Sequence, residues 1–418
     1  MTSGADSRVD ALLAEADRAL AGADRALAEG YPGNRPGCQP VHTVYVPADR
    51  FGPGLAVQWG EQAAAALERW APGPEPFAAA LGLPADLAAD VRPRVRAKLA
   101  EEPVEDLRLD FEDGYGDRGD DAEDADAHRA AATLAAEVAA GTAPPFTGLR
   151  IKSLEAPTRR RAIRTLDAFL AGLGGRTSLP PGFVVTLPKV TSAEQVAVMA
   201  GLCDRLEQAH GLGQGRLRFE VQVETPQVIL GADGTAVVAR CIPAARGRLT
   251  GLHYGAYDYS AALGIAAAQQ SLEHPVADHA RAVMQVAAAG TGVRLSDGSS
   301  NVLPVGDADE VTGAWALHAR LVRRSLERGF YQGWDLHPAH LVSRYAATFG
   351  FFRAGLPAAA ARLRDYTTHA DGGVLEEPAT ARALAGFLGR GLDCGAVSAA
   401  ELADLTGLGR GSLDELRA

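Results

Sequence analysis

Two carboxylates stand at the ends of two apolar segments of the sequence. Glu224 ends FEVQVE, and Asp258 follows TGLHYG shortly afterwards, in GAYDYSAALG. If these segments are neighbouring strands of one sheet, the carboxylates converge, and converging carboxylates repel each other unless a cation or a proton lies between them. Oxygen ligands that leave positions open for water and substrate oxygens suit Mg²⁺. We therefore interpret Glu224 and Asp258 as ligands of one divalent ion.

Further polar side chains stand at or just after the ends of other β-like segments. They are Asp110, Glu112 and Asp113 of LDFEDG, Arg150 and Lys152 of LRIKS, Lys189 of LPKV, Gln222 of VQVE, Asp297 of RLSD and His337 of DLHP. Any one of them alone is more often a loop-capping or ion-pairing residue. Together they indicate one site, because ligands of barrel enzymes bind at the C-terminal ends of the strands.

Two chemical roles follow from these residue types. Arg150 offers a planar pair of donors for a substrate carboxylate or phosphate. For the group that accepts the substrate's proton, the alternatives are a water held by Glu112 or Asp113 and the imidazole of His337. The sequence does not decide between them, and His337 equally fits a residue that only positions its loop.

The elements that must position these residues form a regular series. Short β-like runs alternate with longer Ala- and Leu-rich helical stretches, as a parallel sheet with crossover helices requires. The runs are 42–47, 107–112, 148–153, 183–188, 219–224, 250–255, 292–297 and 333–338. Eight such units predict a closed (β/α)₈ (TIM) barrel, an α/β fold, over 42–345. We expect an insertion at 52–105, an N-terminal helical extension over 1–41 and a helical C-terminal region over 346–418.

The N-terminal extension has helical spacing of its own. Leu13, Leu20 and Leu27 lie seven residues apart, with Ala16 and Ala23 between them, in the near-duplicated ADRALAG ADRALAE. This pattern predicts an amphipathic helix over 9–29. Since so few heptads rarely specify a coiled coil, we expect the helix to pack on the main body of the protein.

Composition and charge exclude several classes of protein. The 418 residues carry a formal net charge of -11, which argues against general affinity for nucleic acid or an anionic membrane. The C-terminal region contains two short helical segments around a Gly turn, but it has no basic face for DNA. The four cysteines, Cys38, Cys203, Cys241 and Cys394, are scattered, as expected of reduced thiols. With neither a leader pattern nor a long apolar run, we expect a cytoplasmic protein.

The order of the strand-end motifs resembles the HpcH/HpaI aldolase and citrate lyase beta-subunit family. The similarity runs through VYVPADRF, LRLDFEDG, LRIK, LPKV, VQVET, GAYDYSAALG and GWDLHPAHL, about residues 42–345. The resemblance implies a TIM barrel of the phosphoenolpyruvate/pyruvate-binding type. Such a barrel holds Mg²⁺ or Mn²⁺ and cleaves or forms a carbon–carbon bond beside a carbonyl.

The resemblance also implies roles for individual residues. It makes Glu224 and Asp258 the metal ligands and Arg150 the substrate arginine, and it places the following residues beside the substrate and the metal's waters: Asp110, Glu112, Asp113, Lys189 and Gln222. The chain departs from the family where Lys152 replaces the usual asparagine. The extra positive charge suggests a more anionic substrate.

Taken together, these features predict a Mg²⁺-dependent carbon–carbon lyase or aldolase that acts through an enolate. The substrate would be a small carboxylate, either a 2-oxo acid or an acyl thioester such as a coenzyme A thioester. One alternative is phosphoenolpyruvate-type phosphoryl transfer or condensation, with Arg150 and Lys152 holding the phosphate. Another is a non-catalytic accessory barrel. Because members of the family form trimers or hexamers, we also expect a homo-oligomer.

Overall fold

Eight parallel strands form a barrel in the computed structural model, which describes residues 3–35, 37–174, 179–368 and 377–417. The strands are β1 (His42–Pro47), β2 (Asp106–Asp110), β3 (Phe146–Arg150), β4 (Gly182–Leu187), β5 (Arg218–Val223), β6 (Leu249–Tyr254), β7 (Arg294–Ser296) and β8 (Gly333–Asp335). They pair in the order β7-β6-β5-β4-β3-β2-β1-β8, and a bridge between Ser296 and Gln332 links the two ends. The predicted (β/α)₈ barrel is confirmed.

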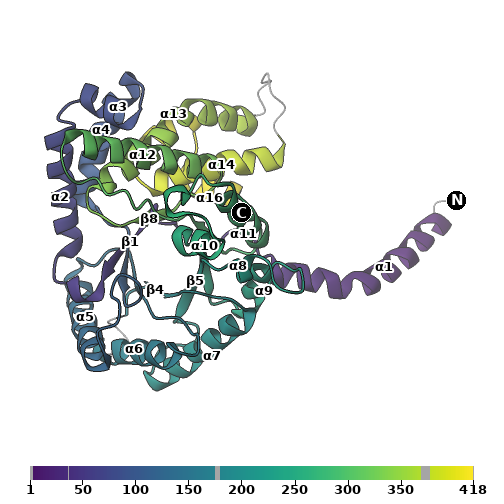
Figure 1. Cartoon of the computed structure of the whole chain (residues 1–418). Coiled ribbons are helices and arrows are strands. Elements are labelled where there is room, and N and C mark those ends of the chain that lie inside the picture. Colours follow the sequence, from purple (N-terminus) through teal and green to yellow (C-terminus); the bar gives the residue numbers. More distant parts are fainter. Residues whose placement is uncertain (1–2, 36, 175–178, 369–376, 418) are drawn as a thin grey trace.

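Helices surround the strands on the outside of the barrel (Figure 1). The longer ones are α5 (Asp120–Ala140), α6 (Arg159–Gly172), α7 (Ala193–Ala209), α9 (Val237–Ala244), α11 (Pro275–Ala288), α12 (Ala308–Glu327) and α13 (His340–Thr368). Two short helices, α8 (Pro226–Ile229) and α10 (Ala256–Ala262), begin directly after β5 and β6. They therefore lie at the strand ends where Glu224 and Asp258 occur. No helix in the described part of the chain is both long and apolar enough to span a bilayer.

Two further helical regions add to the barrel. Between β1 and β2 the chain forms α2 (Leu55–Trp70), α3 (Pro74–Leu81) and α4 (Ala85–Glu101), in the stretch that we expected to be an insertion. After α13 come α14 (Pro378–Asp393), α15 (Ala399–Thr406) and α16 (Arg410–Arg417). Both regions pack against α13, which begins just after β8 and so connects them to the barrel.

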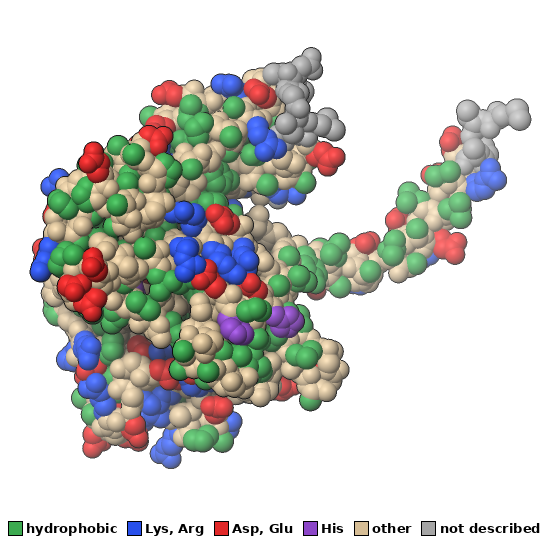
Figure 2. Space-filling model, turned by 45° about the horizontal axis from the view of Figure 1, so that its top comes forward, with side chains coloured by type: hydrophobic (Ala, Val, Ile, Leu, Met, Phe, Trp, Pro, Cys, Tyr) green, Lys and Arg blue, Asp and Glu red, His purple; other side chains and the backbone are tan. Residues whose placement is uncertain are grey.

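The N-terminal helix α1 (Ser3–Gly30) projects away from the rest of the molecule (Figures 1 and 2). Each of its residues from Asp6 onward whose side chain is described is exposed, so the expectation that this helix packs on the main body is wrong. Beyond the helix the chain meets the barrel, where the Gly33 amide donates to the Gly290 carbonyl at 2.8 Å. Among the described residues, the apolar side chains of α1 therefore remain exposed.

The inside of the barrel is charged rather than wholly apolar. Arg108 of β2 is 1% exposed and pairs with Asp106 at 2.7 Å and with Glu220 of β5 at 2.9 Å. His253 of β6 also lies 3.0 Å from Glu220. Since Arg108 joins strands on opposite sides of the barrel, this network fixes the strands beneath the end that carries the candidate site.

Candidate active site

Glu224 is the first residue after β5, and its side chain is buried at the C-terminal end of the barrel. Its Oε1 accepts a hydrogen bond from the Lys189 amide at 2.6 Å, and its Oε2 accepts one from the Gln222 side chain. A Cβ atom on Gly255 would lie 2.5 Å from the Glu224 Cβ, so the glycine leaves room for this side chain. Burial raises the pKa of Glu224 to about 8, although Lys189 lowers it. Burial therefore keeps this carboxyl protonated to a higher pH than an ordinary glutamate.

Arg150, the last residue of β3, is held in one orientation by Asp110, the last residue of β2. The Arg150 Nε and Nη2 atoms donate to the two Asp110 oxygens at 2.7 and 2.6 Å. Those oxygens also accept from the amides of Glu112 at 2.9 Å and Gly114 at 2.8 Å. Asp110, which we expected to contact the substrate, is thus occupied in orienting Arg150.

The remaining Arg150 nitrogen, Nη1, faces the other predicted residues. It donates to the Gln222 Oε1 atom at 3.4 Å and lies 3.3 Å from the Glu112 carboxylate. Because Gln222 also donates to Glu224, its single amide connects the arginine to the buried carboxyl. Arg150 Nη1 is the atom best placed to bind an additional acceptor.

Lys189 gathers the acidic residues, a role that the sequence did not suggest. Its Nζ atom lies 2.8 Å from Glu112, 3.1 Å from Asp113 and 2.9 Å from Asp258. Lys189 has a φ of 50°, in the left-handed region, at the turn directly after β4. At this turn its side chain points toward the acidic residues. Its ammonium therefore already occupies the space between three of the predicted acidic residues.

Glu112 has an unusual protonation equilibrium among these residues. Burial raises its pKa to about 7, while Arg150 and Lys189 act in the opposite direction. A carboxyl whose pKa lies near neutrality can accept a proton in one step and donate it in another. This property, together with its distance of 3.3 Å from Arg150 Nη1, makes Glu112 an acid–base candidate.

Lys152 and His337 lie apart from this cluster. Lys152 donates to the Phe111 carbonyl at 2.8 Å and to Glu123 of α5 at 2.7 Å. His337 accepts from the Ala339 amide at 3.2 Å, and burial lowers the pKa of its imidazole. In the described part of the chain no hydrogen bond or ion pair joins either residue to Arg150 or Glu224, so their predicted roles in substrate binding and catalysis gain no support from the geometry.

One residue missed by the sequence interpretation belongs beside Arg150. The ring of Tyr45, in β1, lies 5.0 Å from the Arg150 guanidinium. A guanidinium over an aromatic ring is attracted by the ring's negative face. The sequence VYVP could have indicated this role, because the tyrosine is two residues from the strand end. However, a tyrosine among valines is also an ordinary core residue.

A known protein family matches most of the chain. Residues 20–418 match the family described as "Domain of unknown function (DUF6986)". The chain belongs to the DUF6986 family. This match does not establish membership of the HpcH/HpaI family, and a comparison with curated proteins found no match.

Solved structures resemble this DUF6986 chain in fold. A citrate lyase from Burkholderia xenovorans is 19% identical with a TM-score of 0.57, over 88% of this chain and 97% of that chain. A malate synthase of Haloferax volcanii is 15% identical with a TM-score of 0.49, over 90% of each chain. CitE of Mycobacterium tuberculosis, in complex with magnesium, acetoacetate and coenzyme A, is 20% identical with a TM-score of 0.49, over 85% and 98%. The likeness to the Burkholderia xenovorans protein shows a shared barrel fold.

The charge balance of the site tests whether a divalent ion suits the DUF6986 chain. Five carboxylates surround two cations, Arg150 and Lys189; they are Asp110, Glu112, Asp113, Glu224 and Asp258. The oxygen donors suit Mg²⁺ or Mn²⁺, and a bound cation would favour ionisation of Glu224, whose pKa burial raises to about 8. However, the described residues contain no group of three acidic, His or Cys side chains arranged to hold an ion. The oxygen donors are therefore of the type that binds such a metal ion, but the Lys189 ammonium would have to move away from Asp258.

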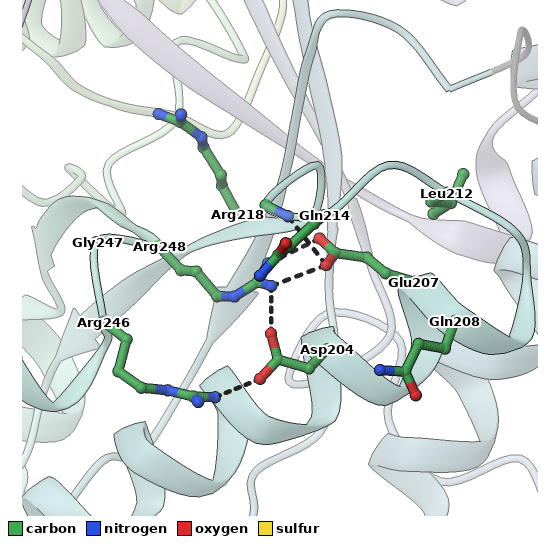
Figure 3. A pocket seen from close by; sticks show the side chains of 10 residues that line it. Asp204, Glu207, Gln208, Leu212, Gln214, Arg218, Arg246, Gly247 and Arg248 are labelled. Atoms are coloured by element: carbon green, nitrogen blue, oxygen red, sulfur yellow. Dashed lines mark hydrogen bonds and ion pairs between the residues drawn. The ribbon is translucent and has the colours of Figure 1, made fainter.

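A separate cavity has a volume of about 590 Å³. Figure 3 shows the side chains that line it. It is lined by residues near the starts of β5 and β6, among them Arg218 and Arg248. Its two carboxylates are already paired, because Asp204 binds Arg246 at 2.6 Å and Glu207 binds Arg248 at 2.7 Å. Since Glu224 and Arg150 lie at the other ends of their strands, this cavity does not belong to the candidate active site.

Proposed function

We propose that this chain is a metal-dependent enzyme that cleaves or forms a carbon–carbon bond beside a carbonyl group. Its substrate would be a 2-oxo acid or an acyl thioester, including a coenzyme A thioester. The observation that carries the proposal is the link from Arg150 through Gln222 to the buried Glu224. It joins a fixed donor for an anion to a buried carboxyl group whose pKa is raised to about 8.

Glu224 and Asp258 would hold the ion, with Mg²⁺ or Mn²⁺ as the candidates. When bound, such an ion supplies a Lewis acid for the substrate's carbonyl and carboxylate oxygens. Lys189, which now contacts Asp258 at 2.9 Å, would keep its contacts with Glu112 and Asp113 instead. The lysine thus sets the charge of the acidic residues beside the substrate.

Arg150 performs the anion-binding step. Because Asp110 fixes Nε and Nη2, the arginine presents Nη1 in one direction. Negative charge develops on the carbonyl oxygen as the carbon–carbon bond breaks, and a preorganised donor stabilises that charge without reorganising during the reaction. The Tyr45 ring, whose centre lies 5.0 Å from the guanidinium, adds a favourable contact.

Glu112 is the proposed proton acceptor. In the cleavage direction, the hydroxyl of the substrate must lose its proton as the bond to the neighbouring carbon breaks. Glu112 lies 3.3 Å from Arg150 Nη1, and its pKa is raised to about 7, so it can take that proton directly or through a water. Asp113 then serves mainly as a partner of Lys189.

The proposed reaction belongs to the same class as that of a citrate lyase, the description carried by the fold relative from Burkholderia xenovorans. Phosphoryl transfer is less well supported. The lysine that favoured it, Lys152, has its ammonium within 2.7 Å of Glu123 and bound to backbone carbonyls.

A screen of substrates tests the proposal. Purified protein is depleted of metal, then incubated with a panel of 4-hydroxy-2-oxo acids and β-hydroxyacyl thioesters, with and without Mg²⁺ or Mn²⁺, and cleavage products are measured. We expect metal-dependent cleavage that Glu224→Gln abolishes and Asp204→Asn retains, because Asp204 lies in the cavity at the opposite end. Cleavage that proceeds equally in the Glu224→Gln variant, or a wild-type protein that binds neither ion in calorimetry, would overturn the proposal.

A further inference from the structure

The N-terminal helix α1 presents an apolar face to solvent. Val9, Leu12, Leu13, Leu20 and Leu27 are between 53% and 63% exposed. Figure 2 shows apolar side chains along much of this projecting helix. With 28 residues at a rise of about 1.5 Å each, the helix is about 40 Å long. It is therefore long enough to make an extensive contact.

The spacing of these side chains follows a seven-residue repeat. Three neighbouring rows make up the apolar face, and they consist of Leu13, Leu20 and Leu27; Val9, Ala16 and Ala23; and Leu12, Ala19 and Ala26. A fourth row, which we name the aspartate row, borders them and consists of Asp10, Asp17 and Asp24. A repeat of seven keeps one face of a helix directed at a partner helix over its whole length.

We propose that the apolar face of α1 binds α1 of a second copy of this chain, with the two helices parallel. The duplicated ADRALAG ADRALAE makes the face repeat along the helix, so two copies in the same register match row for row. Pairing removes the leucines and the valine of both helices from water, which is the main source of stability in such contacts.

The aspartate row decides the orientation of the pair. In a parallel pair, the rows that begin with Leu13 and Val9 meet at the centre of the contact. The aspartate row of one helix then faces the row of Leu12, Ala19 and Ala26 of the other helix. In an antiparallel pair, the aspartate rows face each other, with Asp17 opposite Asp17 of the partner subunit, and like charges repel. The acidic character of the helix also argues against a membrane as its partner, because anionic lipids attract Lys and Arg.

The position of α1 leaves the candidate active site open in the dimer. Just after the helix, Arg35 donates to the carbonyl of Leu249 at 3.0 Å, and Leu249 is the first residue of β6. The helix therefore leaves the barrel near the N-terminal ends of the strands, whereas Glu224 lies beyond the C-terminal end of β5. The proposed contact is thus independent of the proposed function.

The mass of the full chain in solution tests the proposal. We expect light scattering to give wild type a mass that is twice that of the Leu13→Asp/Leu20→Asp variant. Both leucines are exposed, so these changes should not affect folding of the barrel. The matched control is Ala14→Asp/Ala21→Asp, which adds the same two charges on the opposite side of α1 and should keep the wild-type mass. Equal masses for wild type and the leucine variant would overturn the proposal, as would equal loss of mass in the control.

Disulfide crosslinking tests the orientation. Cys38 is the exposed cysteine, so Cys38→Ser provides the background. In a parallel pair, Val9→Cys lies next to Val9→Cys of the second copy and should form a disulfide-linked dimer upon oxidation, while the outward-facing Ala14→Cys should not. An antiparallel pair would separate the two Val9→Cys positions by most of the helix. Dimers that resist crosslinking at position 9 would therefore overturn the parallel arrangement.

Discussion

The Arg150 guanidinium binds both oxygens of Asp110, at 2.7 Å from Nε and 2.6 Å from Nη2. This fork-to-fork contact leaves Nη1 as the nitrogen that faces Gln222 and Glu112. An ammonium could approach Asp110, but it could not make two parallel hydrogen bonds while directing a third donor toward the substrate.

We therefore predict that Arg150→Lys lowers kcat/KM by at least about 30-fold, on the scale of about 2 kcal/mol for a lost hydrogen bond to a charged group. Steady-state kinetics on the substrate found in the cleavage screen measure the effect. Arg164→Lys is the control, because Arg164 is half-exposed on α6 and pairs with Asp124 away from the site. Kinetics unchanged by Arg150→Lys would assign this arginine to structure alone.

The barrel and most of the cluster could be predicted from sequence because strand-end residues of a parallel barrel necessarily lie at one end. The two lysines show the limit of that inference. β3 ends at Arg150, so the backbone no longer alternates regularly at Lys152, whose ammonium binds Glu123 of α5 instead. Lys189 reaches the acidic residues from a backbone turn in the left-handed region, and its sequence context, LPKV, does not predict such a turn. The course of a side chain beyond the last paired residue depends on local backbone geometry, which periodicity does not encode.

The free-standing α1 shows a second limit. Its spacing correctly predicted an amphipathic helix, but an apolar stripe looks the same whether it packs on its own chain or on another. What decides the outcome is the segment after it, residues 31–35, which fixes where the helix leaves the barrel.

Lys189 and a divalent ion should compete for Asp258. We predict that Lys189→Asn increases the rise in Tm that Mg²⁺ produces, since the ion no longer has to displace an ammonium from this carboxylate. Asparagine removes the charge and tolerates the φ of 50°. Without metal, the variant should be less stable by about 1–3 kcal/mol, because Glu112, Asp113 and Asp258 lose their counter-charge. A rise in Tm equal to that of wild type would show that Lys189 does not oppose metal binding.

Gly255 is predicted to control the position of Glu224. In Gly255→Ala, the new methyl group would lie 2.5 Å from the Glu224 Cβ and 2.8 Å from its Oε2, so the carboxylate must shift. We expect loss of metal-dependent activity and of the Mg²⁺ effect on Tm. Gly201→Ala is the control, because nothing lies within 4 Å of the added methyl group and the position is in helix α7. Calorimetric titration with Mg²⁺ measures both variants, and unchanged affinity in Gly255→Ala would refute this role.

His340 should make the protein sensitive to acid. Burial and the neighbouring His318 lower the pKa of His340 to about 3, while Asp335 and the Val302 carbonyl act in the opposite direction. Between about pH 6.5 and 3, the unfolded chain therefore binds a proton at this histidine more readily than the native state does. As the pH falls through this range, the free energy of unfolding decreases by about 1.4 kcal/mol per pH unit.

His340→Gln should remove this contribution, since an amide can still donate to the Val302 carbonyl but does not titrate. Urea unfolding at several pH values gives the comparison, and the free energy of unfolding of the variant should fall less steeply with acid than that of wild type. His279→Gln, at an exposed position of α11, should follow the wild-type curve. Parallel curves for wild type and His340→Gln would contradict the assignment.

Glu224 and Asp258 are expected to act as a pair, because Lys189 contacts both: its backbone amide donates to the Glu224 carboxyl group, and its ammonium pairs with the Asp258 carboxylate. We predict that Glu224→Gln and Asp258→Asn each abolish metal-dependent activity and that the double variant is little worse than either, since residues that act as a unit are not additive. In the absence of metal, the singles should melt no lower than wild type. Asp258→Asn removes a negative charge from an acidic cluster, and Glu224→Gln replaces a carboxyl group whose pKa is already raised to about 8 with a neutral amide of similar shape. The singles should nevertheless lose the rise in Tm that Mg²⁺ gives wild type, since a ligand stabilises only the state that binds it. Thermal melting of the four proteins with and without Mg²⁺ makes the test, and a wild-type Mg²⁺ effect in both single variants would exclude them as ligands.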